Sequence, residues 1–435
     1  MKSLSVAVLL VLATTAAAGS ESHSNACGGE ACDAVIRGFF AFFDRELRGL
    51  EANGRSCADC HMATDHFQLS PASAEARFQL LQKRRKWDRK ADDPLFRPID
   101  ADDFRTNGAR AQDFSNLRQN GLIRIEFALP ANIKLIDPAT NAPSTETAVD
   151  LWRMVPTVND VKLTGPDGLN LWAREPNRGG GYQLDGRIAD LQDQALGALL
   201  NHAQSQSPPP QRMLDDLAAF QRVLFTNARV RALSDAVSAG TMPLPNADPP
   251  LNALEQQGKV VFGRACSHCH GGPGQSTTTA PVVRYHDIVT QCPRPVDTVS
   301  PARFAFKPCP QRLARNARTY EITLPDLSKV RRTSSDPGRA LLSGFVGGPP
   351  PFDDWNKLDV PGLRGIRNTA PYFHNNSADT LEEVVDHYIE FFKRVRALTA
   401  PGAPAPPVAS TDGVNFDRQP QPEERAALLA YLRKL

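Results

Sequence analysis

The sequence has little that points to a membrane or to nucleic acid. Its 435 residues carry 50 Lys+Arg against 48 Asp+Glu, a formal net charge of +2, so no basic surface is indicated. After Leu12 no apolar run approaches the roughly 20 residues of a membrane-spanning helix. No repeat of solenoid period occurs. What remains is an ordinary globular chain, whose length predicts two or three domains.

The first residues predict export. Lys2 gives a positive start, Leu4 to Leu12 is apolar but too short to span a bilayer, and Ala16 to Ala18 offer a small-residue cleavage site. An uncleaved anchor is the alternative, which the small residues disfavour. We therefore expect residues 1–18 to be a signal peptide and the mature protein to lie in the periplasm.

Cysteine is scarce, but the eight cysteines fall into four pairs. Two pairs belong to C-x-x-C-H motifs, CADCH at 57–61 and CSHCH at 266–270, which is the attachment signature of c-type haem. A zinc site and a thioredoxin-like redox pair are the alternatives. Zinc favours two pairs in one compact unit, and the redox motif favours a βαβ pattern; neither fits here. We expect two covalently bound haem c groups, held by Cys57, Cys60, His61, Cys266, Cys269 and His270.

The other four cysteines predict disulfides. Cys27 and Cys32 flank a short Gly-containing loop, and Cys292 and Cys309 flank a Pro-rich stretch. In an oxidising compartment each pair is suited to a disulfide. A metal site built from these four is the alternative, but no histidine is suitably spaced beside them.

Apolar periodicity predicts a mainly α fold. Helical spacing occurs in six segments: 35–50, 190–202, 211–225, 252–262, 380–395 and 423–435. Long Gly- and Pro-rich loops lie between them, and 243–250 resembles a linker. We therefore expect two cytochrome c-type haem domains with long irregular loops, at 19–242 and 251–435.

A set of longer motifs carries a family resemblance. The C-terminal half reads VPGLRGIRNTAPYFH at 360–374 and TLEEVVDHY at 380–388, and the N-terminal half has VPTVN at 155–159, DGR at 185–187 and LQDQA at 191–195. In this order they resemble the bacterial dihaem cytochrome c peroxidases and their MauG-type relatives. The resemblance extends over most of the mature chain and is weaker at 277–307.

The resemblance implies a distal ligand for the C-terminal haem. In the peroxidases a methionine lies fourteen residues after the histidine that matches His374; here that position is Tyr388. Tyrosine resembles the MauG-type proteins, in which a hard phenolate oxygen ligates iron, whereas a thioether raises the reduction potential. A core tyrosine, with His387 as a rival ligand, is the alternative.

The resemblance also implies that the N-terminal haem is open to peroxide or dioxygen. The second histidine that resting peroxidases place beyond the motif would fall near Arg77, and no histidine occurs between His66 and His202. His66 is close to the first motif and is expected on the proximal side or at the surface.

Two positions depart from the family pattern. The glutamate that assists O–O cleavage, ten residues beyond Gln194, is Gln204 here, and an amide cannot shuttle a proton. His202 is the alternative acid–base group, although a surface histidine that closes a helix fits it equally well.

The second departure concerns contact between the haems. The tryptophan that bridges the two haems in the family is Leu184 here. Another aromatic would have to supply the route, and the candidates are Trp172, Tyr182 and Trp355.

A calcium ion between the two haem domains is also common in the family. The matching positions are Asn159, Thr369 and Pro371. Oxygen ligands of this kind suit a hard cation with flexible coordination, although without the resemblance all three read as turn residues.

These expectations combine into a peroxide-dependent dihaem oxidoreductase. It would reduce hydrogen peroxide with electrons from a small cytochrome c, a cupredoxin or a protein side chain. The alternatives are a dioxygen-activating dihaem oxygenase, as in the distantly similar rubber oxygenases, and a non-enzymatic dihaem electron carrier.

Overall fold

The computed structural model describes residues 27–103, 105–106, 109–110, 113–165, 181–276, 285–294, 306–348, 353–398 and 420–435. The predicted signal peptide and Trp172 lie outside these ranges. Of the helices within them, none has the length and apolar character that crossing a membrane requires.

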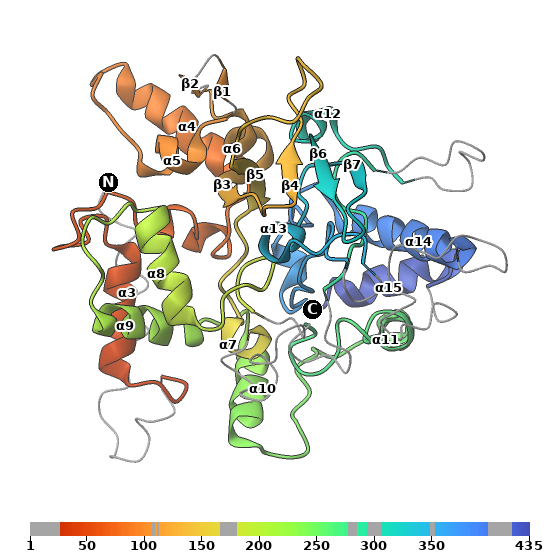
Figure 1. Cartoon of the computed structure of the whole chain (residues 1–435). Helices are drawn as coiled ribbons and strands as arrows, with labels where there is room; N and C mark the ends of the chain where they lie inside the picture. Colours follow the sequence, from red (N-terminus) through yellow and green to blue (C-terminus); the bar gives the residue numbers. More distant parts are fainter. Residues whose placement is uncertain are drawn as a thin grey trace.

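Most of the regular structure is helical, as the periodicity predicts (Figure 1). The α-helices are α3 (Cys32–Phe43), α4 (Pro71–Arg85), α5 (Pro98–Ala101), α6 (Ser115–Asn120), α7 (Val161–Thr164), α8 (Leu191–Asn201), α9 (Gln211–Arg222), α10 (Ala228–Ala239), α11 (Ala253–Ala265), α12 (Gln311–Ala314), α13 (Ala340–Ser343), α14 (Leu381–Leu398) and α15 (Arg425–Leu432). All six predicted helices occur, as α3, α8, α9, α11, α14 and α15, although α3 ends at Phe43 rather than Leu50.

Side-chain caps explain where two of these helices begin. The Asp190 carboxylate accepts a hydrogen bond from the backbone N–H of Asp193 at the start of α8 (2.8 Å). At the start of α11, the side chains of Asn252 and Glu255 each accept a hydrogen bond from the other residue's backbone N–H, which forms a capping box. Such caps satisfy N–H groups that have no partner within the helix.

Within the described ranges three small antiparallel sheets add to the helices, and the apolar periodicity did not predict them. The strands are β1 (Arg105–Thr106), β2 (Ala109–Arg110), β3 (Leu122–Ala128), β4 (Ile133–Leu135), β5 (Ala148–Met154), β6 (Arg318–Thr323) and β7 (Lys329–Ser334). β1 pairs with β2, β3 pairs with β5, and the third sheet has the order β4-β6-β7.

The third sheet joins the two halves of the chain. Ile133 of β4 lies opposite Ile322 of β6, and both side chains are buried in one apolar cluster with Tyr320 and Trp355. In Figure 1 this sheet lies between the helices of the N-terminal part and those of the C-terminal part. The boundary proposed at 243–250 therefore does not separate two independent cores.

A buried ionic network makes a second connection. Arg153 of β5 donates to Asp336 through Nε (2.7 Å) and Nη2 (3.0 Å), and to Asp185 through Nη1 (2.5 Å). All three side chains are at most 1 % exposed. Beside them the backbone N–H of Met154 donates to the carbonyl oxygen of His374 (2.7 Å). The DGR and TAPYFH motifs thus meet at the junction between the halves.

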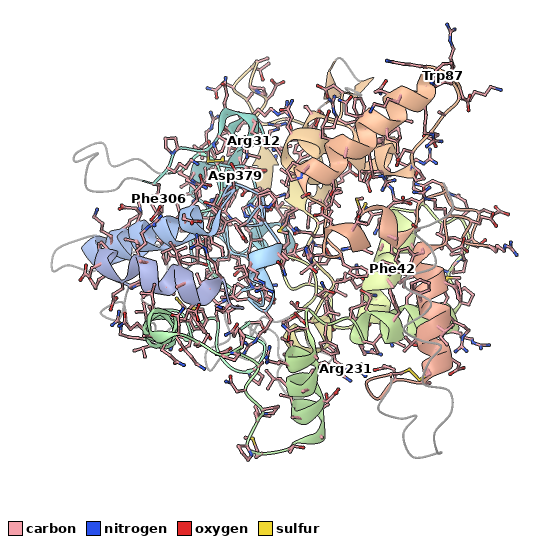
Figure 2. All side chains as sticks on the ribbon, turned by 180° about the vertical axis from the view of Figure 1, so that it is seen from behind. Phe42, Trp87, Arg231, Phe306, Arg312 and Asp379 are labelled. Carbon is pink, nitrogen blue, oxygen red and sulfur yellow. A yellow bond between two sulfur atoms is a disulfide. The ribbon has the colours of Figure 1, made fainter. Side chains whose placement is uncertain are left out.

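In the N-terminal half, α3 crosses α9 at a glycine. A Cβ atom on Gly38 would lie 1.8 Å from the carbonyl oxygen of Asp216, so no larger residue fits without moving a helix. One turn later, Phe42 packs edge-on against Phe220 of α9, with ring centroids 5.2 Å apart. Figure 2 shows Phe42 inside this part of the molecule, in contrast to the protruding Trp87.

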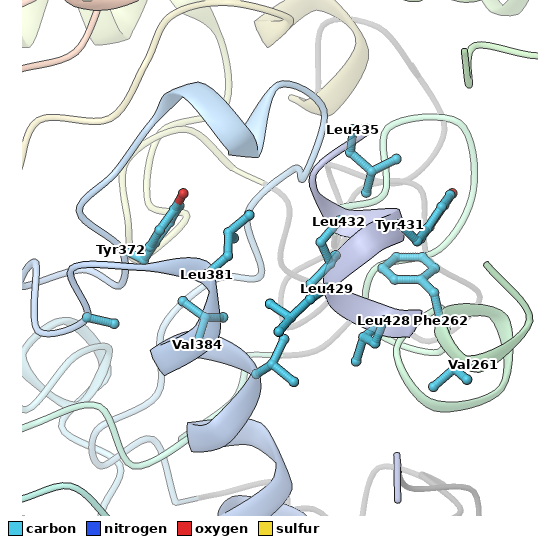
Figure 3. Packing of buried hydrophobic residues seen from close by; sticks show 12 residues of the cluster. Val261, Phe262, Tyr372, Leu381, Val384, Leu428, Leu429, Tyr431, Leu432 and Leu435 are labelled. Carbon is cyan, nitrogen blue, oxygen red and sulfur yellow. The ribbon is translucent and has the colours of Figure 1, made fainter. Parts of the chain in front are cut away.

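In the C-terminal half, α11 crosses α15 in the same way. A Cβ atom on Gly258 would lie 1.9 Å from the carbonyl oxygen of Ala427. One turn later, Phe262 packs edge-on against Tyr431 of α15, with centroids 5.4 Å apart. Figure 3 shows this pair at the end of the C-terminal apolar cluster. Each C-x-x-C-H motif therefore follows a helix that is anchored by a glycine and an aromatic pair.

The two predicted disulfides are present. Cys27 is bonded to Cys32 immediately before α3, and Cys292 to Cys309 beside Trp152. Neither disulfide involves a cysteine of the C-x-x-C-H motifs.

Candidate functional site

The first C-x-x-C-H motif forms a tight turn. Cys57–Asp59 is a 3₁₀ turn, and the backbone N–H of His61 donates to the carbonyl oxygen of Cys57 (2.9 Å). Asp59 is buried and accepts hydrogen bonds from Arg45 (2.6 Å) and Arg77 (2.9 Å). Arg77 thus holds the motif from outside and is not positioned as a ligand.

His61 is oriented as an iron ligand would be. Its Nδ1 lies 3.1 Å from the carbonyl oxygen of Phe67, and the carbonyl of Pro156 also faces the ring. Burial lowers the pKa of His61 to about 4, so the imidazole is neutral at physiological pH. Because Nδ1 carries the proton that these carbonyls accept, Nε2 is the nitrogen left for a metal.

His270 repeats this arrangement in the second motif. Its Nδ1 lies 3.1 Å from the carbonyl oxygen of Pro361 and 3.3 Å from that of Gln275. Burial lowers the pKa of His270 to about 4 as well. Pro156 and Pro361 are the second residues of the VPTVN and VPGLR motifs, so each motif orients the histidine of one C-x-x-C-H segment.

A large cavity adjoins the first motif. Its empty volume is about 1200 Å³, part of which is open to solvent. We call it the first cavity; among its lining residues are Cys57, Cys60, His61, Tyr182, Leu184, Gln194, Leu199, His202 and Gln221. Two thiols without a disulfide, an oriented imidazole and an adjoining cavity fit a covalently bound haem at this place.

Of the two candidate acid–base residues, only His202 lies in the first cavity. His202 caps the end of α8, and its Nδ1 lies 2.9 Å from Oδ2 of Asp100. Gln204 is exposed, and its Oε1 accepts a hydrogen bond from Asn53 (3.0 Å) at the surface. The structure therefore places Gln204 away from the site, because the chain turns outward after α8 with a positive φ of 53° at Gln204.

Asp100 and Arg55 support His202, and no motif or spacing in the sequence points to either residue. Asp100 is 2 % exposed and Arg55 is also 2 % exposed, and the Arg55 guanidinium donates to the Asp100 carboxylate. Burial opposes ionisation of Asp100, but the charge of Arg55 and the hydrogen bond from His202 outweigh it, so the pKa of Asp100 is lowered. An ionised Asp100 accepts a hydrogen bond from the protonated Nδ1 of His202. Nε2 is then the ring nitrogen with a free lone pair that can accept a proton.

At the second motif the structure distinguishes Tyr388 from His387. Burial raises the pKa of the Tyr388 phenol, and the Cys266 and Cys269 sulfurs lie close enough to add to the increase; Cys266 and Tyr388 also pack against the same apolar cluster. His387 instead uses Nε2 in a hydrogen bond with the carbonyl oxygen of Ile288 (2.7 Å). Tyr388 therefore faces the second motif, among the rings of Phe373, Phe391 and Phe392.

Two of the three candidate calcium residues share a cavity. Asn159 and Thr369 line it together with His66, whereas Pro371 does not. The side chain of Asn159 donates to the backbone carbonyl of His66 (3.3 Å). Within the described ranges, no three His, Cys, Asp or Glu side chains come together as a metal site would need.

The aromatic residues that could connect the two haems lie in different places. Tyr182 and Leu184 line the first cavity. Trp355 is buried against Tyr320, with ring centroids 5.5 Å apart, and is not among the residues that line this cavity.

No family model matches the chain, and no curated protein matches it. Among solved structures, the chain is similar to a MauG-like protein associated with microbial copper homeostasis, with 19 % identity, a TM-score of 0.45 and coverage of 93 % of this chain and 89 % of that one. It is also similar to the diheme peroxidase BthA from Burkholderia thailandensis, with 17 % identity, a TM-score of 0.44 and coverage of 93 % of this chain and 86 % of that one. A third similar structure is hydrazine synthase from Kuenenia stuttgartiensis, with 16 % identity, a TM-score of 0.39 and coverage of 93 % of this chain and 88 % of that one. The first two carry the names of the group that the motifs resemble.

Proposed function

We propose that this chain is a periplasmic dihaem oxidoreductase that reduces hydrogen peroxide at its first haem. The observation that carries the proposal is the position of His202, which lines the cavity beside Cys57, Cys60 and His61 and is held by a buried carboxylate. The two disulfides support an oxidising compartment.

The bound haem would supply the iron that polarises peroxide and accepts and releases electrons. Nε2 of His202 removes a proton from one oxygen of hydrogen peroxide and returns it to the other, which departs as water. Asp100 holds the Nδ1–H and so keeps the ring oriented while the proton is on Nε2. Overall, one peroxide, two electrons and two protons give two waters.

Tyr388 and His270 would hold the second haem, which serves the first as an electron store. Phenolate is a hard donor that favours the oxidised metal. The Phe373, Phe391 and Phe392 rings around Tyr388 keep this side apolar. The electron donor would be a small cytochrome c, a cupredoxin or a protein side chain.

The candidate calcium site belongs to the same proposal. Asn159 and Thr369 come from the two halves of the chain and lie on one cavity. Carbonyl and amide oxygens there would suit a hard cation, which would fix the two haem units in position.

The test uses the purified holoprotein mixed with hydrogen peroxide in a stopped-flow spectrometer. We expect a change in the spectrum of the first haem and consumption of peroxide when a reduced small redox protein is present. A ferrous form that binds dioxygen stably, with no peroxide reaction, would select the oxygenase instead. Two six-coordinate haems by electron paramagnetic resonance, with no binding of cyanide, would select the electron carrier.

A further inference from the structure

The two-residue segment Tyr285–His286 contacts both haem units, that is, the parts of the chain around the first and the second C-x-x-C-H motif. Its backbone is fixed, because His286 exchanges two hydrogen bonds with Leu358, at 2.9 and 3.0 Å. The two side chains extend to different halves of the protein. The inference rests on the proposed presence of two haems.

His286 contacts the second motif. Its Nε2 lies 3.6 Å from Sγ of Cys269, the second attachment cysteine. The imidazole is only 7 % exposed, so packing holds it against the thiol. In the holoprotein that sulfur would be a thioether on the porphyrin edge.

Tyr285 contacts the first unit at the DGR motif. Its Oη lies 3.5 Å from the carbonyl oxygen of Gly186. Gly186 has a positive φ of 64°, and a Cβ atom there would lie 2.8 Å from the Tyr285 ring. Only glycine allows the backbone to approach the ring this closely.

A cation covers one face of the Tyr285 ring. The Arg339 guanidinium lies 3.7 Å from the ring centroid and donates to the carbonyl oxygen of Asp185 (3.0 Å). The ring therefore contacts both Arg339 and Gly186. Gly186 lies only two residues from Leu184, which lines the first cavity.

We propose that Tyr285 and His286 form the electron path between the two haem units. One electron leaves the iron of the second haem, which is oxidised by one unit, and reaches the iron of the first, which is reduced by one unit. The electron tunnels through the aromatic pair and the Gly186 backbone, so neither side chain changes its covalent state. Peroxide bound at the first haem is the final oxidant, and a small redox protein is the reductant.

The surroundings of Tyr285 support tunnelling without proton loss. Burial raises the pKa of the Tyr285 phenol well above its usual value, and Asp359 adds to the increase. The phenol therefore keeps its proton. The rival Trp355 is placed less favourably, since it contacts Tyr320 and is not among the residues that line the first cavity.

The test measures electron transfer directly, without turnover. The holoprotein is prepared with both haems ferric, and a radiolysis pulse adds less than one electron per molecule. The electron that moves from the second haem to the first is followed by absorbance. Tyr285→Leu removes the ring and opens a gap beside Gly186, so we expect transfer to slow by about tenfold or more.

Matched variants separate a path from a structural role. His286→Leu should slow transfer in the same way, and Tyr285→Phe should nearly preserve the rate because the ring stays. Trp355→Phe should leave it unchanged. The reduction potentials of both haems, measured by spectroelectrochemistry, should not change in any variant that slows transfer.

Unchanged transfer in both Tyr285→Leu and His286→Leu would overturn the path, even if the wild-type protein reduces peroxide. A slowed rate accompanied by a shifted haem potential would also overturn it, because the residues would then act on driving force. A protein that shows the expected rates but does not react with peroxide would leave the path in place and refute the proposed function.

Discussion

The two C-x-x-C-H units share a frame and differ in what lies opposite the histidine. In both, a helix glycine and an aromatic pair anchor the segment before the motif, and a Val-Pro carbonyl orients the imidazole. Opposite His61 lies a cavity bordered by polar His202, whereas Tyr388 and a group of phenylalanines lie beside the second motif. The same frame therefore carries an open cavity in one unit and a packed aromatic group in the other, which the proposed function assigns to a reactive and a closed haem.

The largest effect should come from removing the acid–base group of the reactive unit. We expect His202→Ala to slow the reaction of the first haem with peroxide by about 10²–10⁴-fold, the usual contribution of a positioned proton-transfer group. The spectrum of the second haem should not change. Stopped-flow absorbance with peroxide in excess measures both.

Gln204→Ala is the matched control for this prediction. Gln204 is exposed and bonds to Asn53 away from the cavity, so its removal should leave the rate within about a factor of two. If Gln204→Ala slows the reaction more than His202→Ala does, the distal side is wrongly assigned.

Breaking the ionic network at the junction should affect both units together. Arg153→Met leaves the Asp185 and Asp336 carboxylates buried without their shared cation. We expect the free energy of unfolding to fall by about 3–5 kcal/mol, as measured by denaturant titration followed by circular dichroism. Equal stability of the variant and the wild type would show that the network does not hold the halves together.

Two glycine variants should instead damage one unit each. Gly38→Ala and Gly258→Ala both place a Cβ atom against a backbone carbonyl of the crossing helix, which we expect to cost about 1–3 kcal/mol or more of stability. Mass spectrometry of proteolytic fragments should show reduced haem attachment at Cys57 and Cys60 in the first variant. In the second variant the loss should be at Cys266 and Cys269.

Gly197→Ala provides the control for both. In α8 a Cβ atom on Gly197 would meet only the Asn201 side chain, at 4.0 Å, so this change should stabilise the helix by about 0.5–1 kcal/mol. If the three variants behave alike, the two helix crossings are not close-packed as described.

The smallest effect concerns a partly buried carboxyl next to His286. Burial raises the pKa of Asp287 to about 6, so between about pH 4 and 6 the folded state holds a proton that the unfolded state has released. Stability therefore falls as the pH rises through this window and stays lower above it. Asp287→Asn does not titrate, and we expect it to be about 1–2 kcal/mol more stable than the wild type at pH 7.5.

At pH 4 the same variant should have no advantage. The folded-state carboxyl is then protonated and carries no buried charge, and the amide loses part of the hydrogen bonding with Asn356. Denaturant titrations at the two pH values measure the difference. A gain of equal size at both would show that the carboxyl is not ionised in the folded protein at pH 7.5.

The sequence predicted the parts of the site that have a fixed spacing. The C-x-x-C-H motifs, the two disulfides and the helices that begin at Asp190 and Asn252 all depend on near neighbours in the chain, and the structure contains them. Asp100 could not have been paired with His202 in this way, because 102 residues separate them. Gln204 was a candidate because of its register, but one residue with positive φ turns the chain away from the cavity.

The sheets were missed for a similar reason. β4 has only three residues, and its partner β6 comes from the other half of the chain. Its apolar residues Ile133 and Leu135 are buried only because β6 places Tyr320 and Ile322 opposite them. Tyr285–His286 likewise has no local pattern, since its contacts at Gly186 and Cys269 are 99 and 17 residues away in the sequence.

The pairing of β4 with β6 also limits how the protein can be divided. A fragment that begins after the Pro-rich segment at 243–250 would contain β6 and β7 but not β4, so the outer edge of β6 would present unpaired backbone groups to other molecules. Such a fragment invites association with further copies of itself. A single-haem half made for spectroscopy would therefore need the 133–135 strand fused back beside β6, or a charged residue placed on that edge.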